Sequence, residues 1–482
     1  MIGFQDIIGV IPCAKKNVKK DQDFYFEIHS YSVAVSECGS GCGCFGGSGG
    51  SAGGSERVSE RVRKKRVDVI QCEDLVSYWN WQHAINRVIR GLDIVVSECV
   101  SECVSEGVSG DRQGVIEAPP IRRVLVVVNP VGGTGIALKI WKRDTEPMLL
   151  AANIEYTLLI TERANHAKEY MTREDLTMFN RILIIGGDGL IFEVVSGIMA
   201  RDDQEQVFKN IPLAPIPGGS GNGLAMSILF ECGEVCTPSV ATFVAITGTP
   251  AFLDISKATT TSESYFSFLS LSWGMVADVD LNSESMRWMG EARFTVSGIN
   301  RVIEKKLYRG RLSMLLADSH TGGSITTPIS DRAGMTYDEE SQVQQDVILP
   351  PVTEPLEVGG DPRWLVLEDD FAMVWVMQTS HASTSMYTGP GATLNDGVFT
   401  VLVVRNCSRL TLLKIMIEME TGNHVKIPEL EVYKAKAYRL EPLTDEGLYS
   451  LDGERIEYGP FQCEMHSTSS LQVLKSNNKA SQ

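Results

Sequence analysis

A glycine turn that carries an aspartate, Gly186-Gly187-Asp188-Gly189, is the segment of this chain best suited to chemistry. It follows an apolar β-branched run, 182–185, and precedes a segment with apolar residues at helical spacing. A strand, a glycine turn and a helix present backbone N–H groups to a phosphate. An aspartate would repel the phosphate, unless it acts on a metal ion or a substrate hydroxyl beside it. The alternative is a tight turn whose aspartate caps the helix, and the tetrapeptide alone does not decide between them.

Two further glycine loops, 132–135 and 218–223, also follow apolar runs. In an open parallel sheet, ligands bind at the carboxyl ends of the strands. One glycine loop is a weak signal, but three at successive strand ends predict a phosphate-binding edge.

The elements that must position these loops change in type along the chain. Residues 121–250 alternate strands and helices, which predicts an α/β catalytic domain with a mainly parallel sheet. Residues 251–470 read mostly as strands, which predicts an antiparallel β-sandwich or barrel-like domain with a long polar loop at 318–362. The segment 264–279 is expected to be strand. The segment 408–420 is expected to be a helix with Ser408 as its N-cap.

The remaining segments are assigned by composition. Residues 1–92 predict a small N-terminal module of strands and one helix, interrupted at about 36–60 by a Gly/Ser/Cys-rich insertion. The basic run 61–66 reads as a solvated linker. Residues 93–120 repeat a VSEC pattern and are expected to be a low-complexity linker, and residues 471–482 a disordered tail.

Charge and cysteine content limit the partners. The 482 residues carry a formal net charge of −17, which argues against a nucleic-acid partner. No apolar stretch reaches the length of a membrane span. The eleven cysteines lack paired zinc spacing and are expected to be reduced thiols. These observations predict a cytoplasmic protein.

Six motifs, in this order, resemble those of the sphingosine kinases, which belong to the diacylglycerol-kinase-like lipid kinases. They are NPVGGTG, TERANHA, GGDGLIFEVVSG, PGGSGNGLA, SLSWGMVADVDLNSESMRWMGEARF and SLDGERIEYGPFQ. The resemblance covers residues 122 to about 466. It implies ATP as co-substrate, bound between the two large domains, and a lipid held mainly by the second.

The resemblance also implies individual roles. Asp188 matches the general base for the lipid's primary hydroxyl, and Asp188 and Asp452 are the expected Mg²⁺ ligands. Residues matching the family's nucleotide contacts are Asn129, Gly132, Gly133, Gly135, Thr161, Gly187, Gly189, Ser220, Gly221, Asn222, Arg287, Arg293, Asp452, Gly453 and Glu454.

Asp280 matches the residue that pairs with the substrate's amine and hydroxyl, and Ser270 adds a hydroxyl contact. A sphingoid base carries an ammonium and diacylglycerol does not, so a carboxylate facing that cation would discriminate by charge. Asp278 would share a face with Asp280 in a regular strand and is a second candidate for the same role. His424 is expected to be structural.

The resemblance implies an ATP-dependent kinase that converts sphingosine and related sphingoid bases to sphingosine 1-phosphate. One alternative is a ceramide or mixed-specificity lipid kinase. Another is an inactive lipid-binding scaffold, which the presence of every required acidic residue argues against. The lipid substrate implies transient, peripheral contact with a membrane surface, and we also consider a homodimer. The helix at 408–420 would be either core or one wall of the lipid pocket.

Overall fold

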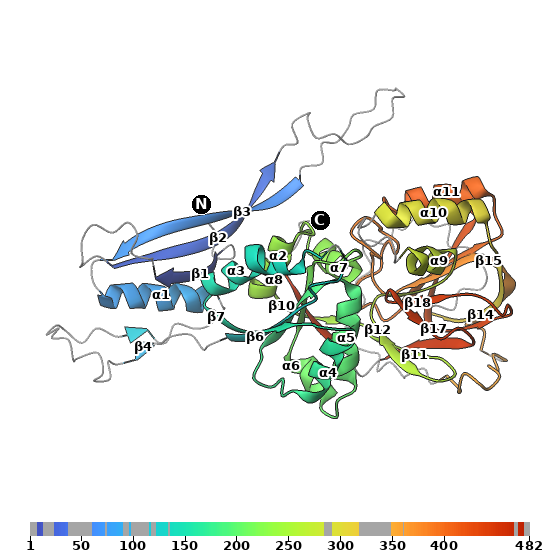
Figure 1. The fold of residues 1–482 in the computed structure, drawn as a ribbon, viewed down its shortest axis with the longest axis horizontal. Helices are drawn as coiled ribbons and strands as arrows, with labels where there is room; N and C mark the ends of the chain where they lie inside the picture. Colours follow the sequence, from blue (N-terminus) through green and yellow to red (C-terminus); the bar gives the residue numbers. More distant parts are fainter. Residues whose placement is uncertain are drawn as a thin grey trace, which may run out of the picture.

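The structure, a computed structural model, describes residues 7–12, 24–36, 60–72, 75–89, 96–97, 115–116, 122–133, 135–283, 292–317, 349–359, 361–466 and 471–476. Figure 1 shows three parts in a row: an N-terminal module, an α/β domain in the middle and a strand-rich domain at the far end. No helix among these residues is both long and apolar enough to cross a membrane.

The middle domain contains a six-stranded sheet in the order β10-β21-β9-β8-β6-β7. All neighbours are parallel except β10 and β21. The strands are β6 (Arg122–Val128), β7 (Ile154–Ile160), β8 (Arg181–Gly186), β9 (Leu213–Pro217), β10 (Thr249–Leu253) and β21 (Leu471–Lys475). The predicted α/β domain with a mainly parallel sheet is confirmed.

Helices cover both faces of this sheet because its central strands are apolar on both sides. Val126 and Leu183 pack in one core cluster, and Val127 and Ile184 pack in the other. One face is covered by α2 (Ala137–Ile140), a π-helical turn (Trp141–Thr145), α3 (Glu146–Ala151) and α8 (Pro238–Thr247). The other is covered by α4 (His166–Arg173), α5 (Asp188–Met199) and α6 (Gln204–Asn210). Helix α7 (Gly223–Glu231) follows β9 and contributes to both clusters.

The tail 471–482 was predicted to be disordered, and this is wrong for residues 471–475. They form β21, which lies between β9 and β10 in the catalytic sheet. Leu471 and Val473 are fully buried there. Residues 471–475 therefore belong to the core of the α/β domain.

The second domain is an antiparallel β structure, as predicted. Its strands are β11 (Ser256–Thr259), β12 (Ser264–Ser267), β13 (Ser270–Gly274), β14 (Tyr308–Leu316), β15 (Trp364–Met377), β16 (Phe399–Arg405), β17 (Leu430–Pro442), β18 (Tyr449–Leu451), β19 (Glu454–Ile456) and β20 (Phe461–Met465). Strand β16 pairs with both β15 and β17, which folds the sheet over its own core.

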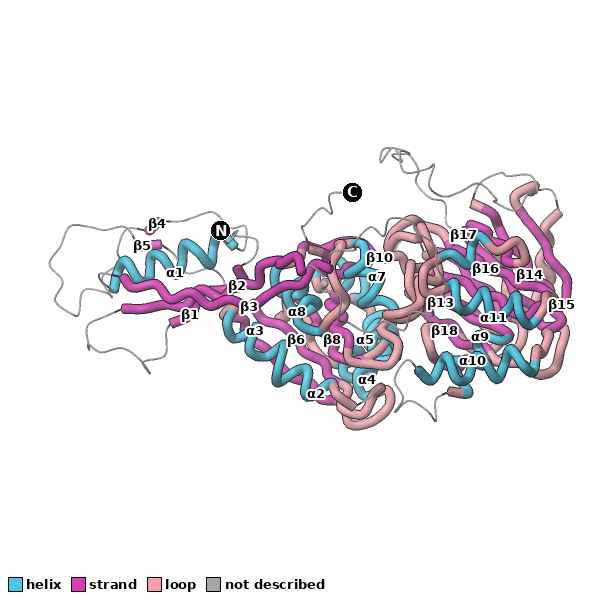
Figure 2. The backbone as a smooth tube through the Cα atoms, turned by 90° about the horizontal axis from the view of Figure 1, so that it is seen from above, coloured by secondary structure: helices cyan, strands magenta, loops and turns pink. Residues whose placement is uncertain are grey.

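Three helices lie together over this domain (Figure 2): α9 (Met275–Asn282), α10 (Ala292–Glu304) and α11 (Arg409–Glu418). The cap on α11 is confirmed, since Ser408 Oγ accepts a hydrogen bond from the backbone N–H of Thr411. The strand expected over 264–279 is wrong after residue 274, where α9 begins. Asp278 and Asp280 therefore lie on a helix and do not share the face of a strand.

The N-terminal module is a three-stranded antiparallel sheet with one helix. Its elements are β1 (Ile7–Pro12), β2 (Phe24–Ser36), β3 (Glu60–Cys72) and α1 (Leu75–Ile89). The basic run 61–66 is part of β3, so the prediction of a linker there is wrong. Ile8 packs into the core cluster beneath α3 and α8, which anchors the module on the α/β domain.

The low-complexity segment 93–120 contains two short paired strands, β4 (Val96–Ser97) and β5 (Val115–Ile116). The rest of its VSEC repeat lies outside the described residues, as do the Gly/Ser/Cys-rich insertion and residues 318–348 of the long loop. The end of that loop packs on the second domain, because the buried Arg439 guanidinium donates hydrogen bonds to the carbonyl oxygens of Pro350 and Glu354.

Candidate active site

The three glycine loops meet backbone to backbone at the carboxyl edge of the catalytic sheet. A Cβ atom on Gly133 would lie 2.8 Å from Gly219 Cα, and one on Gly219 would lie 2.3 Å from Gly187 Cα. Side chains at these positions would push the loops apart. The loops predicted to form one phosphate-binding edge are thus brought together, with glycine required at the contacts.

Two asparagines hold the loops in shape. Asn129 Oδ1 accepts hydrogen bonds from the backbone N–H groups of Val131 and Gly132. Asn222 has a positive φ of 62°, and its Oδ1 accepts from the N–H groups of Gly218 and Gly219. We expected both residues to contact nucleotide. Their amide oxygens hold their own loops, and contact of either residue with the nucleotide stays a prediction.

One cavity of about 1110 Å³ runs from the glycine loops into the second domain. Its polar end includes seven of the residues expected to bind nucleotide: Gly132, Gly133, Thr161, Gly187, Gly189, Ser220 and Gly221. Asn129, Asp452, Gly453 and Glu454 line it as well. Gly135 and Asn222 do not. Gly135 closes its loop by donating a hydrogen bond to the Gly132 carbonyl.

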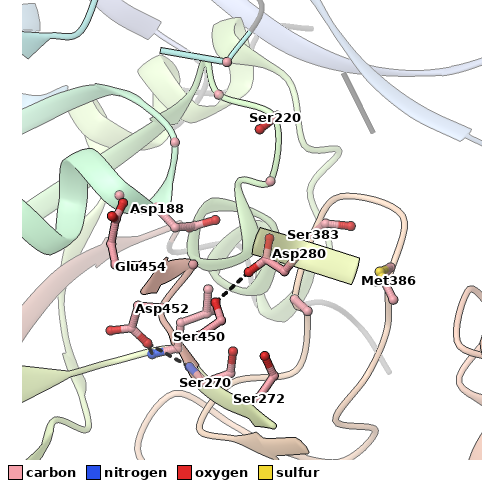
Figure 3. A pocket seen from close by; sticks show the side chains of 18 of the residues that line it. Asp188, Ser220, Ser270, Ser272, Asp280, Ser383, Met386, Ser450, Asp452 and Glu454 are labelled. Atoms are coloured by element: carbon pink, nitrogen blue, oxygen red, sulfur yellow. Dashed lines mark hydrogen bonds between the residues drawn. The ribbon is translucent and has the colours of Figure 1, made fainter. Parts of the chain in front are cut away.

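Asp188 lies in this cavity as the first residue of α5 (Figure 3). Its carboxylate accepts hydrogen bonds from the backbone N–H groups of Gly223, at 2.8 Å, and Leu224, at 3.1 Å. It therefore caps the neighbouring helix α7, and the alternative that it caps its own helix is wrong. Burial raises the pKa of the Asp188 carboxyl, and these N–H donors oppose part of the rise.

Asp452 has a structural role. Its carboxylate is fully buried and accepts hydrogen bonds from Ser267 Oγ and from the backbone N–H groups of Phe268, Leu269 and Ser270. Burial raises the pKa of Asp452 to about 6. Because four protein groups donate to it, this carboxylate stabilises the turn between β12 and β13. It does not fit the expected role of a Mg²⁺ ligand.

Mg²⁺ in kinases is usually held by one or two carboxylates together with substrate phosphates. Asp188 fits such a site, and so does Glu454, whose Oε1 would lie 2.5 Å from a Cβ on Gly189. Among the described residues, no three His, Cys, Asp or Glu side chains gather into a cluster that could hold a metal alone. A metal here would therefore depend on the phosphates for its remaining ligands.

Asp280 lies farther along the same cavity (Figure 3), where its carboxylate accepts a 2.6 Å hydrogen bond from Ser450 Oγ. Ser270 and Ser272 line the same region. Asp278 is buried away from the cavity, and its carboxylate accepts a hydrogen bond from the Tyr308 hydroxyl. Of the two aspartates left open by the sequence, only Asp280 lines the cavity.

The far end of the cavity is apolar. It is lined by side chains from α9, α10, α11 and β15: Met275, Val276, Val279, Ile299, Met373, Trp375, Leu413, Met416, Ile417 and Met419. Leu412 and Ile415 of α11 do not line the cavity and are buried in a core cluster of the second domain. Helix α11 therefore serves both as core and as a wall of the cavity, so the two alternatives for this helix are both realised.

Three other residues that the sequence analysis named remain: two arginines and a histidine. Arg287 lies outside the described residues, as does the side chain of Arg293, whose backbone is part of α10. His424 is fully buried, and its Nε2 lies 2.9 Å from the Thr388 carbonyl oxygen, which supports the structural interpretation.

Sequence reasoning missed several residues that line the cavity. Ser272 and Ser450 escaped notice because an isolated serine carries little signal, although Ser450 is two residues before Asp452. A loop between β15 and β16 also contributes Ala382, Ser383, Ser385 and Met386. Its sequence, HASTSMYTGPG, has no periodicity from which its position could be predicted.

Comparison with known families agrees with this architecture. Residues 123–255 match the diacylglycerol kinase catalytic domain, and residues 349–475 match the YegS C-terminal NAD kinase beta sandwich-like domain. Among solved structures, a diacylglycerol kinase from Bacillus anthracis has the same fold, with a TM-score of 0.51 at 18% identity, covering 75% of this chain and 99% of that one. Fold and site together define a lipid kinase.

The particular family follows from closer relatives. Sphingosine kinase 1 of Homo sapiens is 34% identical over 368 residues, which cover 74% of this chain and 92% of the human protein. Sphingosine kinase 1 of Arabidopsis thaliana is 31% identical over 363 residues, 73% of each chain. Sphingoid long chain base kinase 4 of Schizosaccharomyces pombe is 27% identical over 352 residues, 71% of this chain and 72% of that one. The chain belongs to the sphingosine kinase family.

Proposed function

We propose that this enzyme transfers the γ-phosphoryl group of ATP to the primary hydroxyl of sphingosine and related sphingoid bases, giving sphingosine 1-phosphate. The observation that carries the proposal is the order of groups along one cavity. Glycine loops and Asp188 lie at one end, Asp280 lies beyond them, and an apolar pocket follows. A sphingoid base presents a hydroxyl, an ammonium and a hydrocarbon chain in the same order.

The glycine loops would hold the ATP phosphates through backbone N–H groups, since no side chain stands between backbone and ligand. Asp188 would accept the proton of the lipid hydroxyl as its oxygen attacks the γ-phosphorus and the bond to ADP breaks. Its raised pKa makes it a stronger base than an exposed carboxylate. When bound, Mg²⁺ would neutralise phosphate charge beside Asp188 and Glu454.

Asp280 would supply selectivity for the head group. Its carboxylate can pair with the substrate ammonium, and a lipid without that cation would not gain this attraction. Ser270 and Ser272 add hydroxyl groups that can bond to the polar head. Ceramide has an amide in place of the amine, so the same site would bind it less well.

We also propose that the enzyme acts peripherally on membranes from the cytoplasm. Helices α10 and α11 expose large apolar side chains next to the lipid pocket. Ile303 is 63% exposed and Leu410 is 79% exposed. An apolar surface at the pocket's walls would let a lipid leave the bilayer without crossing water. A homodimer stays a prediction.

The proposal is tested by supplying sphingosine, ceramide and diacylglycerol in turn to the purified protein with ATP and Mg²⁺. We expect phosphorylation of sphingosine to exceed that of the other two lipids. A preference for ceramide or diacylglycerol would overturn the assignment of substrate.

The same assay distinguishes an enzyme from a scaffold. Asp188→Asn keeps an acceptor for one of the two α7 N–H groups and loses the basic carboxylate, so kcat should fall by at least about 10²-fold with sphingosine binding retained. A wild-type protein that binds sphingosine without phosphorylating any of the three lipids would support the scaffold.

A further inference from the structure

The first turn of α7 is held from two sides. On one side, the backbone N–H groups of Gly223 and Leu224 donate to the Asp188 carboxylate. On the other, a Cβ atom on Gly223 would lie 2.8 Å from the carbonyl oxygens of His381 and Ala382. The turn that holds the proposed base is therefore in backbone contact with the second domain.

The contact comes from residues 380–387, in the loop between β15 and β16, which we call the crossing segment. The Thr384 N–H donates a 3.2 Å hydrogen bond to the Gly221 carbonyl, next to the phosphate-binding loop. The His381 ring packs 4.7 Å from the Phe230 ring of α7 and stacks 4.7 Å from Tyr387. The crossing segment thus packs against both the first and the last turn of α7.

Ser227 joins these two sides through one hydroxyl. Its Oγ accepts a 3.0 Å hydrogen bond from the His381 backbone N–H and donates a 2.9 Å hydrogen bond to the Gly223 carbonyl. The side chain is fully buried and does not line the cavity. It is therefore placed to act through its neighbours and not through a ligand.

The crossing segment also reaches the substrate side. Ala382, Ser383, Ser385 and Met386 line the same cavity as Asp280. Figure 3 shows Ser383 beside Asp280. A chain of contacts therefore runs from the lipid-facing segment through His381 and Ser227 to Gly223, and from there to Asp188. Such a chain connects the proposed base to the part of the cavity in which we propose that the lipid head group binds.

We propose that Ser227 is a positioning residue for phosphoryl transfer, which locks the crossing segment to the turn of α7 that holds Asp188. The inference rests on the proposed function of Asp188 as the base for the lipid hydroxyl. Because Ser227 does not line the cavity, loss of its hydroxyl should affect the chemical step and leave ligand binding intact.

The test compares Ser227→Ala with Thr242→Val by steady-state kinetics and thermal unfolding. Thr242 is also a fully buried helical hydroxyl that bonds to the carbonyl four residues before it, in α8, away from the cavity. In Ser227→Ala we expect kcat to fall about tenfold, with KM values for ATP and sphingosine within about twofold of wild type, because small misplacements of reacting groups are costly. Thr242→Val should lower the Tm and leave kcat unchanged.

A second variant guards against misfolding of the first. Phe230→Leu removes the ring contacts with His381 and Tyr387 and should also lower kcat, by about threefold. Unchanged kcat in both variants, or a kcat loss in Thr242→Val equal to that in Ser227→Ala, would overturn the inference. A wild type inactive on sphingosine would instead refute the proposed function, and the comparison would then use whichever lipid is phosphorylated.

Discussion

At the scale of single residues, the aspartates near the site differ in the hydrogen bonds that their carboxylates accept from the protein. Asp188, Asp280 and Asp452 line the cavity, but the Asp452 carboxylate is already bonded to four donors around one turn. Asp278 lies outside the cavity lining and is bonded to Tyr308. The sequence predicted the type and approximate place of these acids. It could not predict which were already bonded within the fold, because those donors lie far away in the chain.

Asp280 and Asp278 can be separated experimentally. Asp280→Asn removes the carboxylate that would pair with the ammonium, so the KM for sphingosine should rise about tenfold or more, with the KM for ATP unchanged. Asp278→Asn should lower the Tm, because it disturbs a buried hydrogen bond to Tyr308, with a smaller change in KM. The reverse pattern in initial-rate kinetics would transfer the role to Asp278.

At the scale of elements, the glycine loops and the strands before them could be predicted, since apolar β-branched runs ending in glycine are a local signal. Helix α9 could not. Apolar residues continue to alternate at 271, 273, 275, 277 and 279, which is the period of a strand. Gly274, with φ of 80°, turns the backbone there, and a Cβ on it would lie 2.7 Å from the Ala372 carbonyl.

The contact between loops predicts unequal effects of two adjacent substitutions. Gly219→Ala places a methyl 2.3 Å from Gly187 Cα, whereas the nearest atom to a methyl on Gly218 is 3.3 Å away. We expect Gly219→Ala to raise the KM for ATP strongly, and Gly218→Ala to have a far smaller effect. Titration of ATP into each protein measures the difference, and equal losses would contradict backbone contact as the cause.

The exposed apolar residues of α10 and α11 predict where the enzyme meets lipid. The double variant Ile303→Ser, Leu410→Ser should reduce co-sedimentation with phosphatidylcholine vesicles by about tenfold or more, since burying each side chain contributes about 1.5–3 kcal/mol. Its kcat on detergent-dispersed sphingosine should not change. Leu443→Ser, at a residue 50% exposed after β17, is the matched control. Equal loss of vesicle binding in the control would refute this docking surface.

At the scale of the whole molecule, the two large domains share more than a cavity. Strand β21 returns from the second domain into the catalytic sheet, where Lys475 forms an ion pair with Glu231 of α7. Glu231 also accepts a hydrogen bond from the Leu394 N–H in the second domain. The sequence did not predict this strand, because it is only five residues long and has polar segments on both sides. The strands that pair with it lie more than 200 residues earlier in the chain.

This strand can be tested by truncation. Removing residues 467–482 deletes Leu471, Val473 and Leu474, whose side chains are fully buried or nearly so. Loss of their burial should lower the free energy of unfolding by about 5 kcal/mol or more. That is comparable to the stability of many domains, so we expect the truncated protein to unfold or aggregate. Truncation after Ser476 should retain the wild-type Tm. A shorter protein that unfolds at the wild-type temperature would show that β21 is dispensable.

The position of β21 also has a consequence during synthesis. Strands β9 and β10 leave the ribosome more than 200 residues before the strand that lies between them. At ordinary translation rates this interval lasts about 10 to 45 s. During this interval the edge of β9 that pairs with β21 has no partner strand. An unpaired strand edge can bind a chaperone or pair with another chain. Completion of the α/β domain therefore waits for synthesis of the second domain.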